Sequence, residues 1–123
     1  MMLTPAPIRV LLVEPHADSR ELYVLGLTAA GFNVIAAVDA ASATVAFAAH
    51  APTIVVTETR LFDGSDLLTW FSDAAVPVIA LTTDPLFSTR GAIATSVSAV
   101  LLKPCSPADV VAAIRAALGV APQ

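Results

Sequence analysis

The chain has 123 residues, 57% of them hydrophobic, and a formal net charge of −4, which suit one domain with its own core and argue against a nucleic-acid binder. The longest charge-free stretches, residues 22–38 and 40–57, are interrupted by glycine, asparagine, histidine or proline, so no membrane-spanning helix is expected. The single cysteine excludes an internal disulfide and fits a reducing, cytoplasmic compartment.

The first predicted element is a buried strand over residues 8–13, an apolar run that ends in Glu14. A helix follows, because Asp18 with Glu21 three residues later forms a capping-box pattern. Apolar residues of this helix recur at helical spacing up to Gly31: Leu22, Leu25 and Ala29. The chain therefore opens with a strand and a helix that covers it.

A second strand is predicted over residues 32–37, and Asp39 then caps an alanine-rich helix. Residues 53–58 form a β-branched apolar run, typical of a strand that is buried on both faces, and this run ends on the carboxylate of Glu58. A third helix is expected near residues 65–71. The carboxyl ends of parallel strands are where sites gather, so Glu58 is a candidate site residue.

The fourth strand, residues 77–81, ends in Thr82, and a weaker helix over about residues 86–95 contains a glycine. The fifth strand, residues 99–102, is followed by Lys103. The last helix has a strong start, with serine as N-cap, proline at the first helical position and aspartate in the first turn: Ser106, Pro107 and Asp109. Its predicted buried stripe is Val110, Ile114 and Leu118.

Five apolar strands that alternate with five helices predict a parallel sheet covered on both faces, a doubly wound α/β fold. We expect residues 1–123 to form one domain with its core over 8–118. Polar side chains follow four of the strands: Glu14, Glu58, Thr82 and Lys103, the only lysine. Together at one sheet edge, they are typical of a site for a divalent cation and a phosphoryl group.

Here the sequence resembles the receiver domain of two-component response regulators over residues 8–118. The segments that carry the resemblance are Val10–Glu14, Gly31–Val34, Pro52–Glu58, Pro77–Thr82 and, most specifically, Leu101–Pro104. The resemblance implies a flavodoxin-like, three-layer, five-stranded parallel sheet with strand order 2-1-3-4-5. It also implies signalling in a phosphorelay.

In that family a histidine kinase donates a phosphoryl group to an aspartate at the end of the third strand, and an acidic pair after the first strand holds Mg²⁺. The resemblance makes Glu14 the first acid of the pair, Thr82 the hydroxyl that contacts the phosphoryl group and Lys103 its cationic partner. Two positions depart from the pattern. Glu58 stands at the acceptor position, and Pro15 stands at the second acidic position.

Both departures change the expected chemistry. Pro15 offers no side-chain oxygen, so Mg²⁺ is expected to bind weakly or not at all, and no other cofactor is expected. Glu58 is one methylene longer than aspartate, and a displacement of about 1 Å can cost about 10²-fold in rate. We expect Glu58 to pair with Lys103 instead, in partial imitation of the modified state. Val100 stands where the family commonly has a switch aromatic, so threonine–aromatic coupling is expected to be absent.

The first hypothesis is therefore a pseudo-receiver, a signalling module that is not an enzyme and acts by binding a histidine kinase or a downstream effector. A homodimer through the fourth helix, fifth strand and fifth helix is also expected from the family. The second hypothesis keeps phosphorylation, with Glu58 as acceptor and the metal held by Glu14 and a backbone carbonyl. A third, a flavin-binding flavodoxin relative, is disfavoured because the loop after the first strand is acidic where a phosphate cradle needs glycine, serine and threonine.

Three further residues have open roles. His16 is interpreted as a solvated loop residue in preference to a nitrogen ligand of the site, and Asp63 and Asp66 as turn residues in preference to compensating metal ligands.

Overall fold

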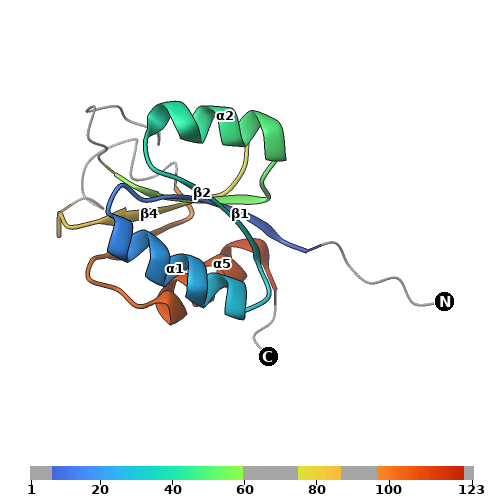
Figure 1. The fold of residues 1–123 in the computed structure, drawn as a ribbon. Helices are drawn as coiled ribbons and strands as arrows, with labels where there is room; N and C mark the ends of the chain where they lie inside the picture. The colour runs from blue at the N-terminus through green and yellow to red at the C-terminus, as the bar shows by residue number, and fades with distance from the viewer. Residues whose placement is uncertain (1–6, 60–74, 87–96, 121–123) are drawn as a thin grey trace.

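The computed structural model describes residues 7–59, 75–86 and 97–120 of the chain (Figure 1). The strands are β1 Arg9–Val13, β2 Asn33–Ala37, β3 Ile54–Glu58, β4 Val78–Thr82 and β5 Ala99–Leu102. The helices are α1 Ala17–Ala29, α2 Ala40–His50 and α5 Pro107–Leu118. The predicted helix near residues 65–71 lies outside the described residues, as does the helix predicted over 86–95 except for its first residue.

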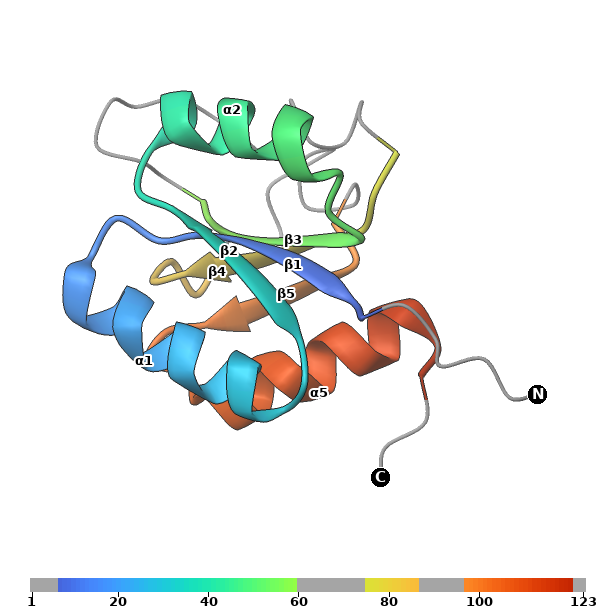
Figure 2. The ribbon, with the colours of Figure 1, turned by 45° about the vertical axis from the view of Figure 1, so that its right-hand side comes forward.

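All five strands are parallel and lie in the order β2-β1-β3-β4-β5, which confirms the predicted doubly wound sheet. α2 covers one face, and α1 and α5 cover the other, so the fold has three layers (Figure 2). The register aligns the strand ends: Val13 pairs with Thr57, and Glu58 pairs with Leu81. The carboxyl ends of β1, β3 and β4 therefore reach the same edge of the sheet.

Successive strand residues point to opposite faces, so two cores form. The larger core, under α1 and α5, contains Val10, Leu12, Ile54, Val56, Ile79 and Leu81 with Tyr23, Leu27, Val110 and Ile114 of the helices. The smaller core, under α2, contains Leu11, Val13, Val55, Val78 and Ala80 with Ala37 and Ala43. β3 and β4 are buried on both faces, as their continuous apolar runs indicate.

The start of α1 differs from the prediction. Asp18 lies in the first turn instead of capping the helix, and the N-cap is His16, whose extended backbone makes no side-chain cap bond. The helix begins earlier because the His16 carbonyl accepts the Arg20 N–H at 2.9 Å, which is the first i to i−4 bond of the helix. Asp18 still suits the first turn, where the helix dipole favours negative charge.

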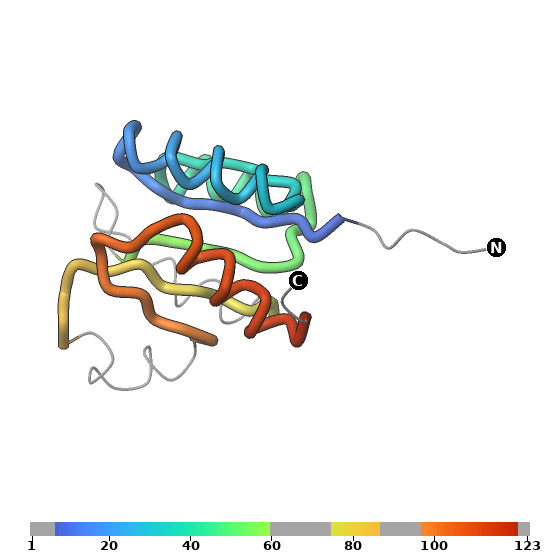
Figure 3. Tube along the Cα trace, turned by 90° about the horizontal axis from the view of Figure 1, so that it is seen from below, coloured from blue at the N-terminus to red at the C-terminus, as the bar shows by residue number. Residues whose placement is uncertain are grey.

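The buried face of α1 also differs from the one that the spacing of Leu22, Leu25 and Ala29 predicts. Tyr23 and Leu27 enter the core, whereas Leu22 and Leu25 are 54% and 63% exposed. α1 lies beside α5 (Figure 3), and a side chain at Gly26 would collide with Pro107 of α5. This close approach of the two helices sets the rotation of α1.

The predicted caps of the other two helices are confirmed. Ser106 and Asp109 bond each other's backbone N–H groups at 3.1 and 3.0 Å. The Asp39 carboxylate accepts the Ser42 N–H at 2.8 Å, and this bond lowers the pKa of Asp39. Within the described ranges, no helix has the length and apolar character to cross a membrane.

Candidate functional site

Glu14, Glu58 and Lys103 meet at the carboxyl edge of the sheet; we call these three residues the strand-exit site. Glu14 directly follows β1, and its N–H donates to the Ala37 carbonyl at 3.0 Å. Glu58 is the last residue of β3. Lys103 directly follows β5, and its N–H donates to the Thr82 carbonyl at 2.7 Å. The parallel sheet thus brings together three side chains that are 44 to 89 residues apart in pairs.

The Lys103 ammonium bonds both carboxylates at once. It donates to Oε1 of Glu14 at 2.7 Å and to Oε1 of Glu58. The side chain of Glu14 is completely buried, and those of Lys103 and Glu58 are 11% and 13% exposed. Burial lowers the pKa of Lys103, but the hydrogen bonds to Glu14 and Glu58 outweigh it and raise this pKa above 10.5. Lys103 is therefore a fixed cation at neutral pH.

The loop between β1 and α1 is held by backbone and side-chain bonds. Arg20 Nη1 donates to the carbonyls of Glu14 and Pro15 at 2.9 and 3.3 Å. The His16 N–H donates to Oε2 of Glu14. Pro15 contributes only its backbone carbonyl to this network, because proline has no side-chain oxygen. The loop thus presents Glu14 and His16 in a defined arrangement.

Thr82 and Val100 are the other two described residues that the sequence placed at this site. The Thr82 hydroxyl is buried, accepts the Asp84 N–H at 3.0 Å and pairs with the Thr59 hydroxyl at 3.3 Å. Val100 on β5 is half-buried, and a hollow of about 160 Å³ lies between it and Thr82. The hollow is also lined by Asp84, Pro85 and Leu102.

A larger hollow of about 480 Å³ opens onto the strand-exit site from the side of α1. Its lining is His16, Ser19, Leu22, Tyr23, Glu58, Thr83, Lys103, Pro104 and Cys105. The Tyr23 hydroxyl donates to the Cys105 carbonyl at 3.1 Å. Burial, followed by the hydrogen bond with Cys105, raises the pKa of Tyr23, so its phenol stays neutral.

Two residues around the strand-exit site, Arg20 and Tyr23, were not predicted from the sequence. Arg20 and Tyr23 lie on α1, and their roles depend on partners that the chain brings from the loop and from beyond β5. Nothing in local spacing marks an arginine that bonds backbone carbonyls. The i, i+4 spacing of Tyr23 and Leu27 was available as a signal, but the neighbouring leucines gave an equally good pattern.

Potential metal ligands also gather here. Among the described residues, one cluster of ligand type exists: Glu14, His16 and Glu58 each place a ligand atom within 4.8 Å of the others. The predicted turn acids, Asp63 and Asp66, lie outside the described residues. The donor set does not fit Mg²⁺, which prefers oxygen ligands in near-ideal octahedral geometry. Proline stands at the second acidic position and offers no side-chain oxygen, and one of the three ligand groups is the imidazole of His16.

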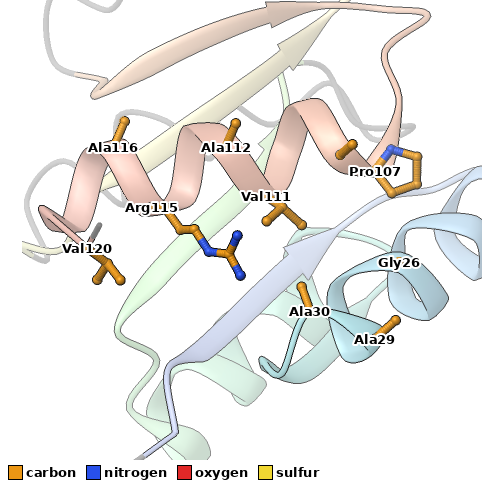
Figure 4. Close-up of a pocket in the computed structure, with 10 residues that line it drawn as sticks. Gly26, Ala29, Ala30, Pro107, Val111, Ala112, Arg115, Ala116 and Val120 are labelled. Carbon is orange, nitrogen blue, oxygen red and sulfur yellow. The ribbon is translucent and has the colours of Figure 1, made fainter. Parts of the chain in front are cut away.

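A third hollow, of about 680 Å³, lies between α1 and α5 (Figure 4). Its walls are small and apolar, apart from Arg115, whose guanidinium carbon lies 5.9 Å from the centre of the Phe32 ring. No carboxylate, thiol or hydroxyl lines it. Among the described residues, the strand-exit site therefore has the stronger case for chemistry.

Solved structures of other proteins have the same fold as this chain. No protein-family model matches the chain, and no curated protein matches it. Among solved structures, the chemotaxis response regulator CheY4 of Vibrio cholerae is similar, with a TM-score of 0.80 and 16% identity over 91% of this chain and 99% of that one. A response regulator receiver domain protein from Clostridium thermocellum has a TM-score of 0.80 and 19% identity, over 90% and 94% of the two chains.

NtrX from Brucella abortus has a TM-score of 0.82 and 22% identity over 93% of this chain, which spans 27% of the NtrX chain. These matches show that the chain has the fold of response regulator receiver domains, with the strand order 2-1-3-4-5.

Proposed function

We propose that this chain is a receiver-like signalling module, a pseudo-receiver that acts by binding other proteins and does not use conventional phosphorylation. The observation that carries the proposal is the simultaneous bonding of the Lys103 ammonium to Glu14 and Glu58. In a receiver the corresponding lysine is expected to meet a transferred phosphoryl group. Here a carboxylate of the chain itself takes that place.

The chemistry of the acceptor position supports the proposal. A nucleophilic carboxylate needs an oxygen that faces the phosphorus atom in line, at about 3 to 3.5 Å. The longer side chain of Glu58 instead delivers an oxygen to the ammonium. Pro15 removes one acidic ligand from the metal pocket, so charge on a transferring phosphoryl group would be poorly neutralised. Slow or absent phosphoryl transfer follows.

The surroundings of Thr82 support a module with a single main state. The Thr82 hydroxyl is engaged by Thr59 and by the Asp84 N–H. Val100 carries no ring that could exchange between an inward and an outward position. The ion pairs would thus hold one conformation that a partner recognises without a covalent signal.

The partners that suit such a module are a histidine kinase or a downstream effector, in the cytoplasm. A homodimer through the fourth helix, β5 and α5 remains part of this proposal; the fourth helix lies outside the described residues. With an acidic balance of −4, nucleic acid is not an expected partner, and no catalytic residue is assigned.

Incubation with acetyl phosphate and Mg²⁺, followed by intact-mass measurement, tests the proposal. We expect no stable gain of a phosphoryl group on the natural chain. The double variant Pro15→Asp, Glu58→Asp restores the two departing positions and is expected to gain one phosphoryl group. A gain on the natural chain that disappears in Glu58→Gln would contradict the proposal. An inert double variant would contradict the role given to Pro15 and Glu58.

A further inference from the structure

We infer that Glu14, His16 and Glu58 form a binding site for a divalent transition-metal ion such as Zn²⁺, and that this site prefers such an ion to Mg²⁺. The inference goes beyond the proposed function and does not rest on it, because a chain that accepts a phosphoryl group could also bind zinc. It assigns to His16 a role as ligand.

The positions of the three groups suit a small ion. One ligand atom from each residue lies within 4.8 Å of the other two. Ligands about 2.1 Å from a tetrahedral zinc ion lie about 3.4 Å apart, so each pair of ligand atoms has to approach by about 1.4 Å at most. Glu14 is buried at the bottom of the site, Glu58 is half-buried, and His16 is exposed at the mouth.

Lys103 leaves room for such an ion. The ammonium bonds Oε1 of both carboxylates. An ionised carboxylate has about four lone-pair sites, so Oε2 of Glu14 keeps acceptor capacity beside the bond from the His16 N–H, and Glu58 keeps capacity on its second oxygen. Arg20 brings a second positive charge close to Glu14, but its printed bonds go to the backbone carbonyls of Glu14 and Pro15 and not to the carboxylates. The carboxylate oxygens that Lys103 does not bond are therefore the ones offered to an entering ion, and the ammonium does not have to leave.

The loop that carries two of the ligands is already ordered. Arg20 bonds the carbonyls of Glu14 and Pro15, and the His16 N–H bonds Oε2 of Glu14. Pro15 adds a fixed backbone torsion between the two ligands. The metal would thus find Glu14 and His16 close to their bound arrangement, and the entropy lost on binding would be small.

The donor types select the metal. Two carboxylate oxygens and one imidazole nitrogen suit zinc and its neighbours in the first transition row, whereas Mg²⁺ prefers oxygen ligands. The same substitutions that remove the family's oxygen-rich pocket leave a mixed nitrogen and oxygen set. A three-ligand set also leaves a coordination position open to water or to a side chain of a partner protein.

Isothermal titration calorimetry of the full chain, without a histidine tag, tests the inference with ZnCl₂ and with MgCl₂ at neutral pH. We expect one zinc ion per chain and much weaker binding of Mg²⁺. His16→Ala is expected to weaken zinc binding by about tenfold or more. The matched control is His50→Ala, because His50 is the only other histidine and lies at the end of α2, before β3 begins. This control should bind zinc as the natural chain does.

Several results would overturn the inference. These are no zinc binding, equal binding in His16→Ala and the natural chain, a loss in His50→Ala, or Mg²⁺ binding as tight as that of zinc. Cys105 lines the hollow that also contains His16 and Glu58, so Cys105→Ser is titrated as well. If zinc binding is abolished in Cys105→Ser but unchanged in His16→Ala, the ion is bound by the thiol and this site is rejected. The phosphoryl-transfer test uses a different readout, so the two proposals fail separately.

Discussion

Replacement of Lys103 by methionine would strand two carboxylates inside the protein. Methionine keeps much of the length and apolar stem of lysine but removes its charge. Glu14 is completely buried and Glu58 is 13% exposed, so neither carboxylate can be fully hydrated in the variant. Removal of one member of a buried ion pair typically costs about 3–5 kcal/mol.

The size of the loss can be bounded from the geometry. Across 2.7 Å the gross Coulomb attraction is about 6 kcal/mol at an effective dielectric constant of 20. The two stranded carboxylates lie close together and can share one proton, which for a glutamate costs about 3.7 kcal/mol at pH 7 and about 1 kcal/mol at pH 5. Protonation is the smaller cost. We therefore expect Lys103→Met to lose about 3–4 kcal/mol at pH 7 and about 1 kcal/mol at pH 5.

Urea unfolding followed by far-ultraviolet circular dichroism at both pH values measures this loss. Arg9→Met is the surface control and should stay within about 0.5 kcal/mol of the natural chain. The double variant Lys103→Met, Glu14→Gln removes the buried charge and should recover most of the stability. A loss below about 0.5 kcal/mol at pH 7, or an equal loss at pH 5 and pH 7, would refute the reasoning.

Three other changes test the fold and the ion pairs. Gly26→Ala should lower the free energy of unfolding by about 1–3 kcal/mol, because the new Cβ would collide with Pro107. Without this collision, alanine would stabilise a helix by about 1 kcal/mol relative to glycine. A higher free energy of unfolding in chemical denaturation would contradict this packing. Ser106→Ala should cost about 1 kcal/mol through the lost cap of α5, and an unchanged urea midpoint would show that the cap is unimportant. Because the pKa of Lys103 is raised in the folded protein, the stability that its charge contributes is complete below about pH 10.5 and is lost as the pH rises through the folded-state pKa. The free energy of unfolding of Lys103→Met should therefore fall less above about pH 10.5 than that of the natural chain. An equal fall in both proteins would contradict this expectation.

The apolar runs were enough to predict the five strands and a parallel sheet, whereas their order in the sheet came from the resemblance to receiver domains. A continuous β-branched run such as that of β3 has few alternatives to a strand buried on both faces, and parallel strands joined by helices leave few topologies. The convergence of Glu14, Glu58 and Lys103 followed from the same rule, because residues that directly follow parallel strands share an edge. The caps at Asp39 and Ser106 were also predictable, since they depend on neighbours three residues away.

The face of α1 was not predictable, because several apolar residues of this helix offered alternative stripes. Only the approach of Pro107 to Gly26 places Tyr23 and Leu27 inside and leaves Leu22 and Leu25 exposed. Likewise, the sequence suggested that Glu58 would reach Lys103 but gave no sign that Lys103 would also bond Glu14, or that Arg20 would fix the loop. Periodicity and capping are local and were determined by the sequence itself. The rotation of a helix and the sharing of one ammonium between two carboxylates depend on atoms from distant segments, and only the tertiary structure decided them.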